Sequence, residues 1–401
     1  MEKFYLMNKD IILLEFVEPD ERGNYKLVTK DDSLQRIMPT AFREDISAAS
    51  LTQFVNERTV SVNRHHIEIV MGKLNLQTKF DMLRYCKGLS LTDSFWVKPT
   101  TDSSSWKDIN LYTNKFDKAL GWMAFTGIPS DVSKHMSTPE LTTVGVLPKY
   151  WDRQGSKVSL IKGGTKDYAN AGLEPISEVC ASVAARLLGI DTVGYYYTVK
   201  DGYHASICQL CTTEDIGLMT ADEYIMHNGW RRSRITIDEF REISKEIDYG
   251  NKKLNQLIFF DDLIRNPDRH LNNWGYFVDN NTREILRPAK IWDSGESLIA
   301  KTIPERDFPL MAASEEQFSS FGIYYKGLRK AFYGQEEQAM CYKIQTLINN
   351  GAMMKEFKER DIPDEFDDKL QIICDILKVR AKMILNDMQD KNSGAVKMSS
   401  F

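Results

Sequence analysis

The chain has 401 residues, of which 42% are hydrophobic and 27% are charged, and its formal net charge is −5. This composition is that of a soluble globular protein, and the length favours two or three structural units over a single domain. The negative net charge, with no apolar run of membrane-spanning length and no basic leader, predicts a cytoplasmic protein that binds neither membranes nor nucleic acid directly.

The six cysteines do not form a disulfide framework in a chain of this length. One pair, Cys208 and Cys211, has CxxC spacing and stands at the end of an expected strand. A zinc site needs two more ligands at matching spacing, and a redox dithiol usually opens a helix after a strand. We therefore interpret the pair as two ordinary buried thiols.

Residues 1–140 are predicted to form an N-terminal accessory region of the α/β type. Its first 35 residues alternate short apolar runs with turn signals such as "EPDERGNYK", which indicates a small β element. Residues 50–88 have apolar positions three and four apart, as helices do, and residues 99–108 are polar and rich in turn formers.

Residues 141–212 are predicted to form a small α+β lobe. The segment "KVSLIKGG" places Val158, Leu160 and Lys162 on one face of a strand, so a lysine points where its apolar neighbours point. "EPISEVCASVAARLLG" has helical spacing and ends at Gly189. "VGYYYTVKDGYHASICQL" predicts two strands around an Asp-Gly turn.

Residues 213–390 are predicted to be mainly helical. The helix "NKKLNQLIFFDDLIR" leads into the polar loop "RNPDRHLNNWG". Two expected strands follow, "WGYFV" and "EILRPAKIW", and the second ends on Asp293. The clearest later helix is "FDDKLQIICDILKVRAKMILNDM", and residues 391–401 are expected to be a flexible tail.

Phosphoryl transfer requires oxygen ligands for magnesium, a carboxylate beside the attacking hydroxyl, and a cation on the phosphates, and the polar loop supplies two of these groups. Asp268 and Asn273 supply a base and an amide ligand, Asp293 a second ligand, and Lys162 the cation. Protein kinases place the same groups in an Asp-x-x-x-x-Asn loop and an Asp-Phe-Gly segment. Taken singly, Asp268 is also typical of a turn cap and Lys162 of a solvated strand.

Four segments together carry a resemblance to a known family: "VSLIKGG", "EPISEVCASVAARLLGI", "NPDRHLNNWG" and "WDSGESL". Over roughly residues 141–390 the chain resembles the HipA-like serine/threonine kinases. "LSLTDSFWVKP" and "TPELTTVGVLPKYW" are similar to stretches of Gram-positive HipA-domain proteins. Since phosphatidylinositol kinases also contain Asp-Arg-His-x-x-Asn, the loop alone does not distinguish HipA-like kinases from phosphatidylinositol kinases. The resemblance implies an α+β, bilobal protein-kinase-like fold with a small β-rich N-lobe (141–212) and a helical C-lobe (213–390).

The resemblance also implies ATP and Mg²⁺ as cofactors and assigns the site residues. Asp268 becomes the catalytic base, Asn273 and Asp293 hold magnesium, Lys162 contacts the α/β-phosphates, and His270 lies against the phosphates or braces the loop. The segment expected to cover the nucleotide comprises Asp152, Arg153, Gln154, Gly155, Ser156 and Lys157. The backbone expected to meet adenine comprises Gln209, Leu210 and Cys211.

Several assignments stay open. The segment over the nucleotide has one glycine, so it departs from the glycine-rich pattern. Ser156 within it is either a regulatory autophosphorylation site or a small turn residue. Glu178 is either the ion-pair partner of Lys162 or a first-turn glutamate favoured by the helix dipole.

Three functions follow as hypotheses: a serine/threonine protein kinase acting on a protein substrate, a lipid or small-molecule kinase, and a catalytically silent nucleotide-binding module. A toxin role with a DNA-binding antitoxin partner rests on family analogy alone.

Overall fold

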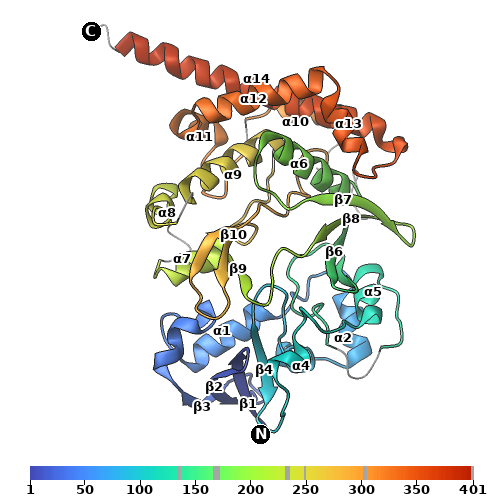
Figure 1. Cartoon of the computed structure of the whole chain (residues 1–401), viewed down its shortest axis with the longest axis vertical. Helices are drawn as coiled ribbons and strands as arrows, with labels where there is room; N and C mark the ends of the chain where they lie inside the picture. The colour runs from blue at the N-terminus through green and yellow to red at the C-terminus, as the bar shows by residue number, and fades with distance from the viewer. Residues whose placement is uncertain are drawn as a thin grey trace. The chain divides into compact units, whose positions relative to one another are not determined.

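The computed structural model describes residues 1–132, 137–165, 172–230, 235–247, 250–300, 305–315 and 317–398. The chain forms two compact units, residues 1–162, 209–233 and 275–287 in the first and 163–208, 234–274 and 288–401 in the second. Figure 1 labels most of the helices and strands of both. The two units interleave along the sequence, and the ranges 1–140, 141–212 and 213–390 remain predictions.

The first unit contains an antiparallel sheet of order β3-β2-β1-β4. Its strands are β1 (Lys3–Asn8), β2 (Ile11–Val17), β3 (Lys26–Lys30) and β4 (Phe95–Pro99). Alternate apolar side chains of β1 and β2, including Phe4 and Phe16, pack with Phe54 and Leu83 of two helices in one buried cluster. The β element expected in the first 35 residues is thus present, and β4 completes it from a distant part of the sequence.

Further elements of the first unit are the short 3₁₀ helices η1 (Asp32–Ile37) and η2 (Thr40–Phe42) and the helices α1 (Ala48–Arg58), α2 (Ile67–Leu74), α3 (Lys79–Tyr85), α4 (Trp106–Ile109), α5 (Lys118–Thr126) and α7 (Ala221–His227). β5 (Lys149–Gln154) pairs with β6 (Lys157–Gly163) as an antiparallel hairpin. A three-stranded sheet has the order β11-β10-β9, with strands Ile285–Pro288, Gly275–Asp279 and Ile216–Thr220. Residues 213–390 were predicted to be mainly helical, but their first element is the strand β9.

The second unit begins with the elements expected around the lysine strand. Helix α6 (Glu174–Leu188) starts with Pro175 in its first turn and ends at Gly189, whose φ of 81° suits a residue without Cβ. β7 (Tyr195–Lys200) and β8 (Tyr203–Gln209) form the predicted hairpin, in which Lys200 pairs with Tyr203. Both predictions are confirmed.

The remainder of the second unit is mainly helical, as predicted. It comprises α8 (Ile237–Ile243), α9 (Gly250–Ile264), η4 (Glu305–Asp307), α10 (Phe308–Ala313), α11 (Tyr325–Phe332), α12 (Gln335–Asn349), α13 (Ala352–Lys358), η5 (Asp364–Phe366) and α14 (Asp367–Met398). α14 packs against α9, α10, α11 and α12. It continues through residues 391–398, where a flexible tail was expected, and residues 399–401 lie outside the described part. In the described residues, no helix combines the length and apolarity needed to cross a membrane.

Candidate active site

The loop that carries Asp268 begins where α9 ends. Arg265 has a left-handed φ of 55°, which breaks the helix, and Pro267 follows two residues later. The side chain of Asn266 bonds the Asp261 carboxylate at 3.1 Å and accepts the backbone N–H of Asp268 at 3.1 Å. These bonds fix the first turn of the loop and leave the Asp268 side chain exposed at its surface.

Asp268 and Asn273 lie together, as the sequence predicted. The side-chain amide nitrogen of Asn273 donates to the Asp268 carbonyl at 2.9 Å and lies 3.4 Å from its carboxylate. Because this nitrogen faces Asp268, the amide oxygen is the Asn273 atom suited to a cation. His270 is exposed, and its Nδ1 accepts the backbone N–H of Asn272 at 3.2 Å, a contact of the kind expected of a brace.

Arg269 joins this loop to the segment that carries Asp293. Its side chain is 3% exposed, and its Nε donates to both carboxylate oxygens of Asp261, at 3.1 and 3.0 Å. One terminal nitrogen donates to the Asn273 carbonyl at 2.6 Å and also to the Trp292 carbonyl. The other donates to the Ser294 hydroxyl at 3.0 Å. The sequence reasoning assigned Arg269 no role.

The backbone of Asp293 is in the left-handed region, with a φ of 57°, which is uncommon for a residue other than glycine. Asp293 interacts with the buried side chain of Tyr195. Burial raises the pKa of that tyrosine well above its usual value, and the Glu178 and Asp293 carboxylates raise it further. β11 ends at Pro288, so Asp293 follows a separate backbone bridge between Ile291 and Thr192 and does not end a long strand as expected.

The electrostatics of Asp268 agree with a site that includes Asp293. Partial desolvation by the surrounding loop raises the pKa of Asp268, the Asp293 charge raises it further, and His270 and Arg269 oppose the rise. Because the carboxylate charges influence one another, the two groups belong to one electrostatic site. A carboxyl with a raised pKa is a better proton acceptor than an ordinary aspartate.

Glu178 lies on α6 in the second unit, and its carboxylate is 2% exposed. It accepts the hydroxyl of Ser206 at 2.6 Å. The acidic first-turn residue of α6 is Glu174, so the helix-dipole interpretation of Glu178 was wrong. An ion pair with Lys162 stays a prediction.

Lys162 lies on β6 in the first unit and is 5% exposed. This burial excludes the alternative of a solvated strand lysine. The segment expected to form a loop over the nucleotide is instead a tight hairpin, in which only Gly155 and Ser156 form the turn. The φ of Gly155 is 62°, a conformation that glycine adopts without strain.

Other residues of this hairpin have contacts within the first unit. Arg153 donates to the carbonyls of Leu111 and Tyr112, at 2.5 and 2.8 Å, and stacks 4.9 Å from the centre of the Phe116 ring. Burial lowers the pKa of Arg153. Its guanidinium is thus held by protein groups, which weakens the expectation that it meets a phosphate.

The segment's other side chains are exposed except that of Asp152, which is partly buried. Gln154 donates to the Asp152 carboxylate at 3.0 Å, while Ser156 and Lys157 are exposed. The backbone expected to meet adenine is anchored to β6, because the Leu210 N–H donates to Val158 at 2.9 Å.

Gln209 and Cys211 are exposed, whereas Cys208 is buried. Neither cysteine is part of a disulfide, and the prediction of two buried thiols holds for Cys208 but was wrong for Cys211.

The residues of the site fit a magnesium ion that keeps some water ligands better than a metal ion held by protein ligands alone. Among the residues that the structure describes, no three His, Cys, Asp or Glu side chains gather as a metal site. Magnesium in kinase-type sites takes one or two carboxylates and completes its shell with water and phosphate oxygens. The Asn273 oxygen and the Asp293 carboxylate, held together through Arg269, match that requirement.

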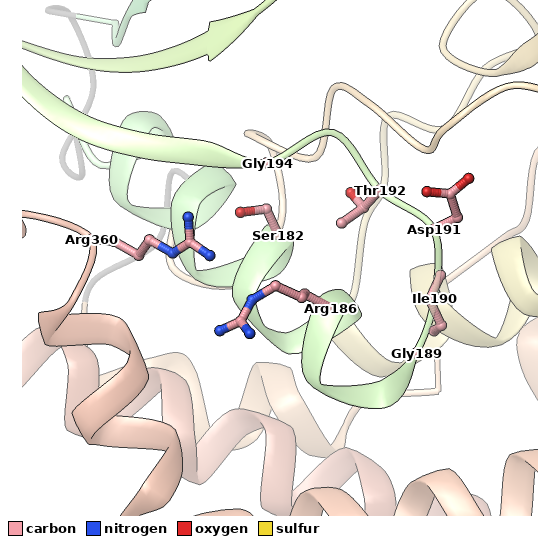
Figure 2. Close-up of a pocket in the computed structure, with 8 residues that line it drawn as sticks. All are labelled: Ser182, Arg186, Gly189, Ile190, Asp191, Thr192, Gly194 and Arg360. Atoms are coloured by element: carbon pink, nitrogen blue, oxygen red, sulfur yellow. The ribbon is translucent and has the colours of Figure 1, made fainter. Parts of the chain in front are cut away.

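A separate cavity of about 290 Å³ lies in the second unit, and none of the expected site residues lines it. Figure 2 shows Arg186 and Arg360 on one side and the segment from Gly189 to Gly194 on the other. Arg186 pairs with Glu356, and Arg360 lies 4.3 Å from the centre of the Tyr196 ring. Both guanidinium groups are therefore already engaged by the protein.

Comparison with known proteins identifies the fold. No protein-family model and no curated protein matches the sequence. The chain is similar to HipA of Shewanella oneidensis MR-1, solved with HipB and operator DNA, with a TM-score of 0.58 and 12% identity over 96% of this chain and 99% of that one. It is also similar to the proinflammatory kinase CtkA of Helicobacter pylori, with a TM-score of 0.49 and 15% identity over 64% of this chain and 94% of that one.

The likeness to HipA confirms the expected fold class: the chain has a HipA-like, bilobal kinase fold. The assignment to a Gram-positive type stays a prediction.

Proposed function

We propose that the chain is an ATP- and Mg²⁺-dependent kinase that transfers the γ-phosphoryl group to a serine or threonine hydroxyl of a protein substrate. The observation that supports this most is the arrangement around Arg269, which joins the Asp268–Asn273 loop to the Asp293 segment by hydrogen bonds. A catalytically silent module has no need of an exposed carboxylate poised beside two cation ligands. The HipA-like fold supports the same conclusion by analogy.

In this scheme each residue has one task. The substrate hydroxyl oxygen bonds to the γ-phosphorus as the bond between that phosphorus and the β–γ bridging oxygen breaks, and ADP leaves. Asp268 accepts the hydroxyl proton. Asn273 and Asp293 would hold magnesium, which neutralises phosphate charge when bound. Lys162 would contact the α/β-phosphates, for which its compact ammonium is suited.

Asp268→Asn tests the assignment. The amide keeps the size and the hydrogen bond to Asn273 but cannot accept the proton, so we expect ATP affinity to persist while phosphoryl transfer falls by at least about 10²-fold. Purified parent and variant are incubated with labelled ATP and magnesium, alone and with a cell extract.

The destination of the label separates the alternatives. Label on protein bands supports the proposal, label in the lipid or small-molecule fraction supports the second kinase hypothesis, and ATP binding without turnover supports the silent module. Transfer by the variant within about tenfold of the parent, a difference near 1.4 kcal/mol, would mean that Asp268 is not the base. An antitoxin partner remains an analogy, since HipA was solved together with HipB.

A further inference from the structure

A short hairpin at residues 317–325 lies directly before α11. Phe318 and Tyr324 form an antiparallel backbone bridge, and the Ser319 N–H donates to Ile323 at 2.9 Å. The turn closes through the Gly322 N–H and the Ser319 carbonyl at 3.0 Å, with Gly322 at a φ of 69°. These bonds give the hairpin a fixed shape.

The hairpin is bonded to the loop that carries Asp268 on both sides of that residue. Before Asp268, the Gln317 side-chain amide donates to the Asn266 carbonyl at 2.6 Å. After it, the Ser320 hydroxyl donates to the Arg269 carbonyl. The candidate base and the hairpin therefore share one hydrogen-bonded framework, all within the second unit.

One residue of the hairpin anchors it, while two others face solvent. The Phe321 ring lies 5.7 Å from that of Phe240 and 6.4 Å from that of Trp274. By contrast, Phe318 and Tyr324 are 51% and 49% exposed, and their rings stack at 3.9 Å with an interplanar angle of 30°. A pair of adjacent exposed rings is a small apolar platform, unlike a single exposed aromatic residue.

We infer that the Phe318–Tyr324 platform binds the segment of a protein substrate beside its acceptor serine or threonine, and selects an apolar side chain there. The inference rests on the proposed function and names its substrate class. Phe318 is two residues from Ser320, a chain distance of at most about 7 Å, so a polypeptide with its hydroxyl at Asp268 reaches the platform within a few residues. A small molecule has no flanking segment to place on these rings.

The alternative is that the stacked rings only stabilise the hairpin, and substitutions separate the two roles. Phe318→Ala and Tyr324→Ala remove one ring each, while Tyr324→Phe keeps the ring and removes the hydroxyl. Tyr342→Ala on α12 is a matched control, because Tyr342 is also 49% exposed in the second unit. Phe318→Leu keeps apolar bulk if the alanine variant unfolds.

The probe is a library of peptides with one central serine or threonine and each flanking position varied in turn, with labelled ATP and magnesium. We expect the parent to favour a large apolar residue at one flanking position by at least about tenfold, the low end of the range for one apolar contact. Each alanine variant should lower that preference to within about twofold, without changing ATP affinity or hydrolysis of ATP in the absence of peptide. Tyr324→Phe, Phe318→Leu and Tyr342→Ala should keep it.

Three negative results are distinguishable. Peptide phosphorylation without an apolar preference, or with a preference unchanged in both alanine variants, would overturn the inference and leave the kinase intact. Label that appears only in lipid vesicles or small molecules would overturn the choice of a polypeptide substrate. No transfer to any acceptor would overturn the proposed function and this inference with it.

Discussion

Replacement of Arg269 by methionine should destabilise the second unit and disable the site together. The arginine is 3% exposed and is the cation bonded to the equally buried Asp261 carboxylate. Burial raises the pKa of Asp261, and the guanidinium opposes that rise, so removal of the guanidinium leaves a buried carboxyl without its compensating charge. Such a loss costs about 3–5 kcal/mol, a large share of the roughly 5–15 kcal/mol that stabilises a domain.

Three other acceptors lose a donor in the same variant: the carbonyls of Asn273 and Trp292 and the hydroxyl of Ser294. Water can replace some of these bonds, so we take the ion-pair loss as the main cost. The functional consequence comes from geometry, because a misplacement of about 1 Å in a catalytic group costs on the order of 10²-fold in rate. Arg269→Lys keeps the charge but not the planar fork, so its effect should be intermediate.

A double-mutant cycle in urea isolates the ion pair. The free energy of unfolding is measured for the parent, Arg269→Met, Asp261→Asn and the double variant. In the Asp261→Asn background, Arg269→Met leaves no buried carboxylate without a partner. The loss in free energy of unfolding caused by Arg269→Met should therefore be smaller there by at least about 2 kcal/mol. A coupling below about 0.5 kcal/mol, or full phosphoryl transfer by a folded Arg269→Met variant, would refute this account of the arginine.

Three further predictions concern metal, pH and modification. Asp293→Ala should abolish the tightening of ATP binding by magnesium; calorimetry of the parent with equal ATP affinity with and without magnesium would contradict the metal assignment. Burial, and after it the positive charge of Arg43, lower the pKa of His227 from 6.5 to about 4. Below pH 6.5 the imidazole therefore binds a proton in the unfolded chain but stays neutral in the folded chain. The free energy of unfolding therefore decreases as the pH is lowered, by about 2 kcal/mol between pH 7 and 5. His227→Gln should remove that part of the loss in unfolding experiments, and identical pH dependence would contradict it. Ser156 occupies an exposed turn, and its phosphorylation should lower activity by placing roughly −1.5 to −2 charges beside bound ATP; mass spectrometry with no phosphate in residues 148–160 of an active kinase would exclude it.

The local parts of the fold were predictable because their signals are local. Helix α6 shows its apolar spacing and its terminal glycine within 16 residues, and the β7–β8 hairpin shows its Asp-Gly turn. β9 was missed because its partner β10 lies more than 50 residues away and its own sequence, "IGLMT", is short. Gly217 within it is required by close approach, since a Cβ there would meet the Asn280 side chain at 2.2 Å and the Thr92 carbonyl at 2.9 Å. Neither neighbour is near Gly217 in sequence.

In the candidate site, too, some residues were predictable from the sequence and one was not. Asp268, Asn273 and Asp293 could be selected because their types and spacing match a known chemistry. Arg269 could not, because its partners come from α9, from the end of the loop and from the Asp293 segment. One signal was present: "LIFFDDLI" places two aspartates in a helix that is otherwise apolar, and buried carboxylates need buried cations. Asp261 has Arg269, and Asp262 has Arg329 and Arg380.

The chain differs from the protein-kinase pattern at two positions whose side chains are in contact. Where that pattern has leucine after the catalytic aspartate and phenylalanine after the metal-binding aspartate, this chain has Arg269 and Ser294. In the structure these two residues are partners, joined by a hydrogen bond of 3.0 Å. Gly295 remains, and a Cβ there would come within 3.6–3.9 Å of Glu174 and Glu178 atoms on α6. Both positions are therefore polar in this chain, and the hydrogen bond between them holds the Asp293 segment to the Asp268 loop.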